Sequence, residues 1–99
     1  MSSIDSKIKG EEMDLLFNAI LKLENIEECY SFFEDVATIN EVKALAQRIQ
    51  VAKLLSEKKT YTEIAEITKA STATISRVNR CVNYGTGGYN IVLERLKIK

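Results

Sequence analysis

"YTEIAEITKASTATISRV", residues 61–78, holds two short amphipathic segments that only TKAS separates. Apolar residues at helical spacing give each segment one inward face. The residues expected on these faces are Ile64, Ala65 and Ile67 in the first segment and Ile75, Val78 and Val82 in the second. A TYTE capping box at 60–63 opens the first segment, and Ser71 can N-cap the second. The stretch therefore predicts two helices joined by a tight turn, the helix-turn-helix pattern.

The outward face of the second predicted helix, residues 71–83, carries short polar side chains and arginines. These are Thr72, Ala73, Ser76, Arg77, Asn79 and Arg80. A helix with short side chains at its N-terminal end can approach base edges in the DNA major groove, while arginines reach phosphates. An ordinary helical hairpin with a solvated face is the alternative, and Lys69 occupies the turn position where glycine is usual.

The charges of the chain are separated along the sequence. Residues 1–41 carry ten acidic and three basic side chains, a net charge of −7, although the whole chain is neutral. Residues 42–99 carry four acidic and eleven basic side chains, a net charge of +7. A basic half favours a polyanionic partner, whereas a solvated surface is the alternative.

From residue 11 onward, most of the rest of the chain is predicted to be helical apart from one loop. The expected helices cover 11–25, 26–36, 38–58 (opened by a TINE capping box at 38–41) and a short final segment, IVLERLK. The sequence YGTGGYN at 84–90 is expected to end the second helix of the pair with Gly85 in a left-handed conformation and to continue as a loop.

Two of these helices are apolar on more than one side. Apolar residues cover well over half the circumference of the 11–25 helix and form two lines along the 38–58 helix. A surface helix normally has a single apolar stripe, and a chain of 99 residues has little core with which to cover a second one. The pattern therefore predicts a homodimer.

Composition argues against several classes of function. The chain has no His, and therefore lacks the usual general base and the common zinc ligand. We therefore expect that the protein is not an enzyme and that it holds no metal ion and no resident cofactor. Cys29 and Cys81 form no C-x-x-C motif and are expected to be reduced. With no signal peptide and no apolar run near 18 residues, the sequence predicts a cytoplasmic protein without membrane contact.

Residues 38–82 resemble the Trp repressor family, and most closely its smaller branch in Gram-positive bacteria. The text that carries the resemblance is TINEVKALAQRIQVAKLL and then TYTEIAEITKASTATISR, while YGTGGY resembles the tail of that branch. The resemblance implies an all-α, Trp-repressor-like domain with a helix-turn-helix, assembled as an intertwined homodimer. Its two reading helices would lie one helical turn of DNA apart, about 34 Å.

The resemblance also implies an organisation and a DNA-binding surface. One domain over 1–99 would hold dimerisation helices in 1–37, the core helix and helix-turn-helix in 38–83, and a loop and helix in 84–99. By position, Thr72, Ala73, Ser76 and Arg80 would face the bases, and Thr60 and Lys69 would lie near phosphates.

A co-repressor pocket is implied by the same matching of positions. Thr38, Arg48, Thr74 and Arg77 match positions that line the L-tryptophan pocket of the family, where the two arginines enclose the indole. However, Val78 stands where the family has glycine, and Cys81 where it has a serine that helps the ligand. The valine takes up space without adding a contact, so we doubt that tryptophan binds. Arginines that satisfy helix C-termini or nearby carboxylates are the alternative.

The sequence therefore predicts a homodimeric, sequence-specific transcriptional regulator, a repressor, that reads double-stranded DNA with helix 71–83. The rival hypothesis is a protein-interaction module whose acidic half binds a partner and whose helix-turn-helix is vestigial. The salt dependence of DNA binding distinguishes the two, because phosphate neutralisation gives a steep slope.

Overall fold

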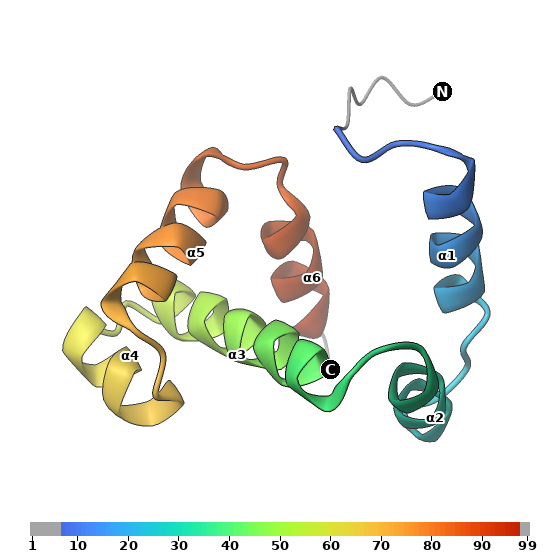
Figure 1. Cartoon of the computed structure of the whole chain (residues 1–99). Coiled ribbons are helices and arrows are strands. Elements are labelled where there is room, and N and C mark those ends of the chain that lie inside the picture. Colours follow the sequence, from blue (N-terminus) through green and yellow to red (C-terminus); the bar gives the residue numbers. More distant parts are fainter. Residues whose placement is uncertain (1–6, 98–99) are drawn as a thin grey trace. The chain divides into compact units, whose positions relative to one another are not determined.

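The computed structural model describes residues 7–97, and within this range the chain forms six α-helices and no strand (Figure 1). The helices are α1 (Glu11–Leu21), α2 (Ile26–Val36), α3 (Ile39–Ser56), α4 (Tyr61–Thr68), α5 (Thr72–Tyr84) and α6 (Gly88–Leu96). The all-α class predicted from the sequence is confirmed. The chain divides into two compact units, the first ending at Thr38 and the second beginning at Ile39. None of the described helices is long and apolar enough to cross a bilayer.

The N-terminal unit contains α1 and α2, and neither helix has a buried residue. α1 stops at Leu21, short of the predicted end at residue 25. The N–H groups of Lys22 and Leu23 bond three residues back, to Ala19 and Ile20, which tightens the last turn. Asn25 then caps α2, because its Oδ1 accepts the Glu28 N–H at 2.9 Å. Asn25, which the hydrophobic pattern assigned to the first helix, therefore serves as the N-cap of α2.

The C-terminal unit is built along α3, which packs against α4, α5 and α6 (Figure 1). α3 begins at Ile39 and ends at Ser56, close to the predicted bounds. The core draws on every element of this unit and consists of Val51, Ala52, Leu54, Ile64, Ala70, Ile75, Val78 and Leu93. The stripe predicted for the second helix of the pair is confirmed at Ile75 and Val78, which are buried, and at Val82, which packs against the core.

The inward face of α4 differs from the prediction. Ile64 is buried and Ala65 is half-buried, but Ile67 is 52% exposed and Thr68 is buried instead. Residues 64 and 68 are four apart and lie on one face of a two-turn helix, which leaves Ile67 rotated toward solvent. The Thr68 hydroxyl donates to the Ile64 carbonyl at 2.8 Å and accepts the Ala70 N–H at 3.1 Å. Its polarity is therefore satisfied locally.

Thr68 also ties the helix pair to α3. The Gln47 Nε2 on α3 donates to the Thr68 carbonyl at 3.1 Å, a partly buried hydrogen bond between residues far apart in sequence. This carbonyl lies in the last turn of α4, where intrahelical donors run out. The bond fixes the end of α4 on α3, and with it the start of the turn into α5.

Thr68→Val is expected to lower the free energy of unfolding by about 1–3 kcal/mol. Valine keeps the shape of threonine but leaves the N–H of Ala70, itself buried, without its acceptor. Urea denaturation measures the effect. Thr62→Val is the matched control, since Thr62 is an exposed threonine on the same helix, and its change should stay within about 0.5 kcal/mol. Equal midpoints for the two variants would contradict this role of the Thr68 hydroxyl.

Two lysines hold the left-handed backbone conformation in which glycine is usual. Lys58 follows α3 with φ 66°, and Lys69 follows α4 with φ 64°. After α3, the Lys58 N–H bonds to the Leu55 carbonyl and the Lys59 N–H to the Leu54 carbonyl, the pattern of a Schellman motif. A residue with a Cβ in this conformation costs on the order of 1 kcal/mol. The turn between α4 and α5 thus has the left-handed geometry that usually requires glycine, although Lys69 occupies the position.

The glycine loop after α5 corrects another prediction. Gly85 is not left-handed, since its φ is −85°, but a Cβ there would collide with the Cys81 carbonyl. Close approach to the preceding turn is therefore the physical reason for glycine at 85. Gly87 is the left-handed residue, with φ 93°. It precedes α6, which begins at Gly88 and so includes residues predicted to lie in the loop.

Candidate nucleic-acid interface

The capping box predicted at 60–63 is confirmed at the start of α4. The Thr60 Oγ1 accepts the Glu63 N–H at 3.1 Å, and the Glu63 carboxylate accepts the Thr60 N–H at 2.8 Å. The latter bond lowers the pKa of Glu63 below its ordinary value of 4.5. Since that pKa is lower in the folded chain, the charged form stabilises the fold at neutral pH, and this contribution is lost as acid protonates the carboxylate.

The predicted cap of α5 is also confirmed. The Ser71 Oγ accepts the Thr74 N–H at 3.1 Å, which satisfies one of the free donors at the helix start. Only Lys69, Ala70 and Ser71 separate α4 from α5. Burial of Ala70 and of the Ile75 side chain sets the rotation of α5 about its axis. The short side chains at its N-terminal end consequently face away from the core.

The structure places the six predicted DNA-binding residues on or beside the helix pair. Thr72, Ala73 and Arg80 are exposed on α5, and Ser76 is half-buried on the same helix. Thr60 is exposed at the start of α4, and Lys69 is exposed in the turn. All six therefore belong to one structural unit, and only Ser76 has restricted access to solvent.

An open depression of about 460 Å³ lies between α4 and the start of α5. It is lined by Tyr61, Thr62, Ala65, Glu66, Lys69 and Thr72. The prediction included Lys69 and Thr72 but missed the contribution of α4. The signal was present in the sequence for Thr62 and Glu66, which fall on the helix face opposite the buried Ile64 and Thr68.

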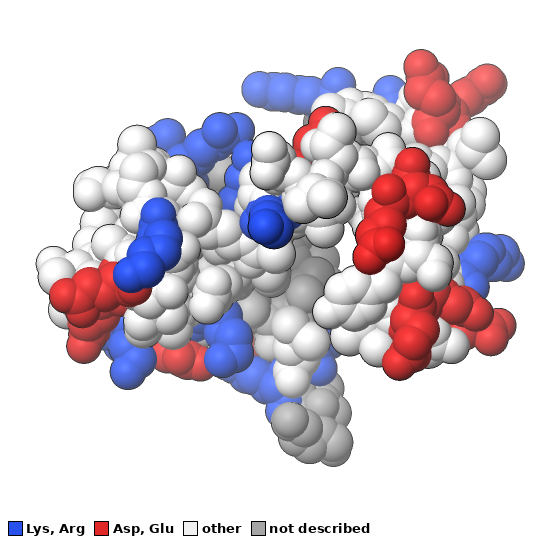
Figure 2. Space-filling model, turned by 60° about the horizontal axis from the view of Figure 1, so that its bottom comes forward, with Lys and Arg blue, Asp and Glu red and all other residues white. Residues whose placement is uncertain are grey.

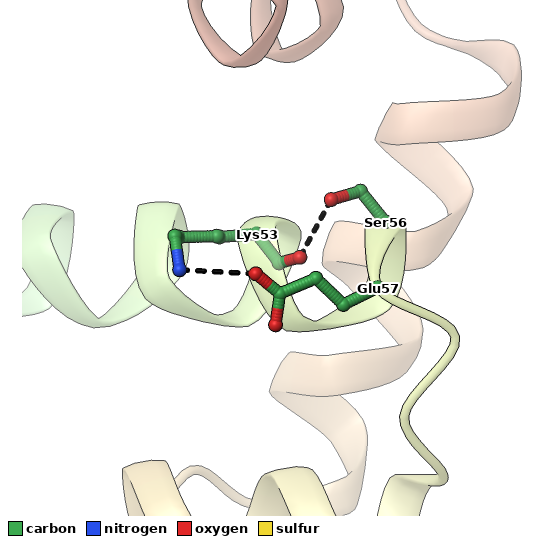
Figure 3. Close-up of polar contacts among 3 residues, drawn as sticks. All are labelled: Lys53, Ser56 and Glu57. Atoms are coloured by element: carbon green, nitrogen blue, oxygen red, sulfur yellow. Dashed lines mark hydrogen bonds and ion pairs between the residues drawn. The ribbon is translucent and has the colours of Figure 1, made fainter. Parts of the chain in front are cut away.

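The charge separation along the sequence is also visible on the surface. Figure 2 shows Asp and Glu side chains gathered on the N-terminal unit and Lys and Arg side chains at several places on the C-terminal unit. Lys53 on α3 is neutralised locally, because its Nζ lies 3.0 Å from the Glu57 carboxylate (Figure 3). Ser56 donates to the Lys53 carbonyl at 2.6 Å in the same turn.

The predicted ligand-binding residues are distributed over both units. Arg48 is half-buried on α3. On α5, a helix that packs against α3, Thr74 is half-buried and Arg77 is exposed. Thr38 is the last residue of the other unit. Val78, the residue expected to reduce the pocket, is 2% exposed and belongs to the core. Its isopropyl group therefore occupies packed space.

Comparison of the sequence and the fold with those of known proteins identifies relatives of a single family. Residues 11–97 match the model of the Trp repressor protein family. The uncharacterized protein YerC of Bacillus subtilis (strain 168) is 56% identical over 91 residues, which cover 92% of this chain and 88% of that protein. A TrpR-like protein from Eubacterium eligens ATCC 27750 superposes with a TM-score of 0.89 at 58% identity, covering 93% of this chain and 95% of that one. A candidate Trp repressor from Staphylococcus aureus has the same TM-score at 47% identity, covering 100% and 98%.

The all-α fold, with two capped helices joined by a short turn, is typical of helix-turn-helix domains. The chain belongs to the Trp repressor family, whose match extends over α1 to α6. This family is regulatory rather than enzymatic. The resemblance noted in the sequence is thereby confirmed.

Proposed function

We propose that the protein is a sequence-specific transcriptional repressor that reads the DNA major groove with α5. The observation that carries the proposal is the outward face of α5, where Thr72 and Ala73 project beside an open depression rather than into the core. Their small size lets the helix approach base edges closely. The capped turn and the Gln47 hydrogen bond to Thr68 hold that face in a fixed orientation.

Different residues of this surface would have different roles on DNA. Thr72, Ala73, Ser76 and Arg80 would meet the bases, where Arg80 is the only long charged donor among them. Thr60 and Lys69, which lie at the two ends of α4, would contact phosphates. Phosphate contacts position a protein on the duplex, whereas base contacts select the sequence. This division of roles predicts a large non-specific component of affinity.

Assembly as an intertwined homodimer would complete a single domain over residues 1–99. The support is the apolar surface left open in one chain, and the N-terminal unit, whose helices bury no residue, contributes much of it. Its exposed large apolar side chains include Leu15, Phe17, Leu21, Ile26, Tyr30 and Val36. α6 adds Ile91, Val92 and Leu96, which are also exposed. Large exposed apolar side chains in such number favour association, and a second copy would supply the missing contacts.

We expect the protein to sediment as a dimer at micromolar concentration and to unfold and dissociate in one step. Because α1 and α2 bury nothing by themselves, their stability should come from the partner chain. Sedimentation equilibrium and concentration-dependent thermal melting measure this coupling. A folded monomer that persists at those concentrations would contradict the dimer and the two-half-site geometry that depends on it.

Selection of binding sites from random duplex DNA tests the proposed function directly. We expect a two-fold-related sequence whose half-sites are one helical turn apart. A titration on random DNA should show affinity that falls steeply with salt. An interaction module with an acidic N-terminal unit would enrich no sequence and show a flat salt response, and that outcome would replace the repressor proposal.

A further inference from the structure

Gln47 makes a directional contact between α3 and the helix pair. Its Nε2 donates to the Thr68 carbonyl at 3.1 Å across 21 positions of sequence, and the bond is partly buried. The caps at Thr60 and Ser71 lie within the pair and order each helix by itself. Apolar contacts also hold the pair on α3, but they have no preferred direction. The hydrogen bond needs a short distance and an aligned donor, and it therefore restricts rotation of the pair on α3.

The Thr68 carbonyl depends on this donor. Thr68 is buried, and the hydrogen bonds described for residues 7–97 give its carbonyl no second partner. A buried carbonyl left without a partner costs more free energy than an ordinary hydrogen bond contributes when it forms. If the Gln47 donor is lost and its space stays filled, the carbonyl can regain a partner only from water. The end of α4 must then move away from α3.

Thr68 is also the residue from which the chain turns into α5. Lys69, directly after it, holds the left-handed conformation that changes the direction of the chain. Residues 69–71 alone separate α4 from α5, and Ser71 is the N-cap of α5. Because the connection is this short, a rotation at the end of α4 changes the direction of α5. The contact of Gln47 consequently acts on the orientation of the proposed reading helix.

We propose that Gln47 is a positioning residue for DNA recognition, whose side-chain amide keeps α5 in the orientation that fits the major groove. The inference rests on the proposed DNA-binding function. Gln47 is uncharged and half-buried on α3, so it acts through the Thr68 carbonyl rather than by touching DNA. A chain without this amide divides its time between the competent orientation and others. Its apparent affinity for DNA falls in proportion to the competent fraction.

Gln47→Met tests this role, because methionine has a similar length and fills the same space without a donor. Loss of one such bond should reduce the competent fraction about 2- to 10-fold in each chain. Two chains read the DNA in the proposed homodimer, so affinity for a selected site should fall about 4- to 100-fold. The slope of log affinity against log salt should keep its wild-type value, because no phosphate contact is lost. All variants are compared at one protein concentration, well below their melting temperatures.

Gln50→Met is the matched control. Gln50 is an exposed glutamine on the same helix, and the substitution makes the same chemical change without removing the bond to Thr68. Its DNA affinity should equal that of the wild-type protein. Gln47→Asn is the second test variant, since it keeps an amide whose side chain is one methylene too short for the Thr68 carbonyl. It should share the loss of affinity, and it takes the place of Gln47→Met if that variant does not fold.

Amide hydrogen exchange separates positioning from a general loss of stability. In free Gln47→Met, the amides of Lys69 and Ala70 should exchange faster than in the wild-type protein. The amide of Ala52, in the buried part of α3, should keep its wild-type rate. Saturating DNA should return both turn amides to the rates of DNA-bound wild-type protein, because DNA shifts the population towards the orientation that it binds. A general loss of stability would instead speed exchange at all three positions and leave the affinity of the folded protein unchanged.

The outcomes distinguish this role from the function on which it rests. Wild-type protein that binds no DNA would overturn the repressor proposal, and the positioning role with it. Wild-type binding with equal affinities for Gln47→Met and Gln50→Met would overturn the positioning role alone. A lower salt slope in Gln47→Met would place Gln47 at a phosphate, and faster exchange at Ala52 to the same degree as in the turn would assign it to stability. Either result would also overturn the positioning role.

Discussion

Val78→Gly is expected to lower the free energy of unfolding by about 3–4 kcal/mol. The buried isopropyl group, 2% exposed in the core, contributes about 2–3 kcal/mol, and glycine inside α5 costs about 1 kcal/mol more. Urea denaturation of the variant measures the total. Val78→Ala keeps the helix propensity and isolates the side-chain contribution, whereas Arg80→Gly, at an exposed position of the same helix, isolates the backbone contribution.

The same valine determines the expected response to L-tryptophan. The family encloses the indole between positions that correspond to Arg48 and Arg77, but Val78 is packed into the core where a glycine would leave space. A ligand shifts an equilibrium only through different affinities for two states. Millimolar L-tryptophan should therefore change neither the melting temperature nor the DNA affinity of the wild-type protein, and should raise the melting temperature of Val78→Gly alone. Saturable micromolar binding to the wild-type protein in calorimetry, coupled to tighter DNA binding, would contradict this expectation.

Arg80→Ala should weaken binding to a selected DNA site by about 5- to 150-fold, equivalent to about 1–3 kcal/mol. Arg80 is exposed on α5, so the substitution removes a donor without disturbing the core. Affinity for the selected site and for random DNA is measured at the same salt concentration. A base contact predicts a loss confined to the selected site, while an equal loss on both DNAs would show that Arg80 touches phosphate alone. Arg95→Ala on α6 provides the control for the change in charge.

Features determined by a few neighbouring residues were predicted correctly from the sequence. The caps at Thr60 and Ser71 are of this kind, because each depends on a hydroxyl and an N–H three residues away. The rotation of α5 about its axis was also predictable, because Ile75, Val78 and Val82 form the single apolar stripe on this helix. The outward placement of Thr72, Ala73 and Arg80 follows from that rotation.

Features decided by competing interactions were not predictable in this way. Hydropathy favoured Ile67 as the inward residue of α4, but the Thr68 hydroxyl is satisfied within its own turn. The Thr68 carbonyl also accepts a hydrogen bond from Gln47 on α3, a contact that no local pattern reveals. Gly85 was expected to be left-handed because glycine commonly ends helices, yet its role is close approach to Cys81. The proposed contacts of Arg48 and Arg77 depend on a ligand, and those of α1 on a second chain. Their test lies in binding experiments.

The open N-terminal unit has a consequence for the life of the protein in the cell. α1 and α2 leave the ribosome first, but they bury no side chain within a single chain. In the proposed homodimer they would stay open until a second chain arrives. During that interval, proteases can reach a segment that has little protection of its own. Encounters between chains increase with the square of their number, so newly made chains survive better when synthesis is fast. The lifetime of this regulator should therefore lengthen as its own expression rises.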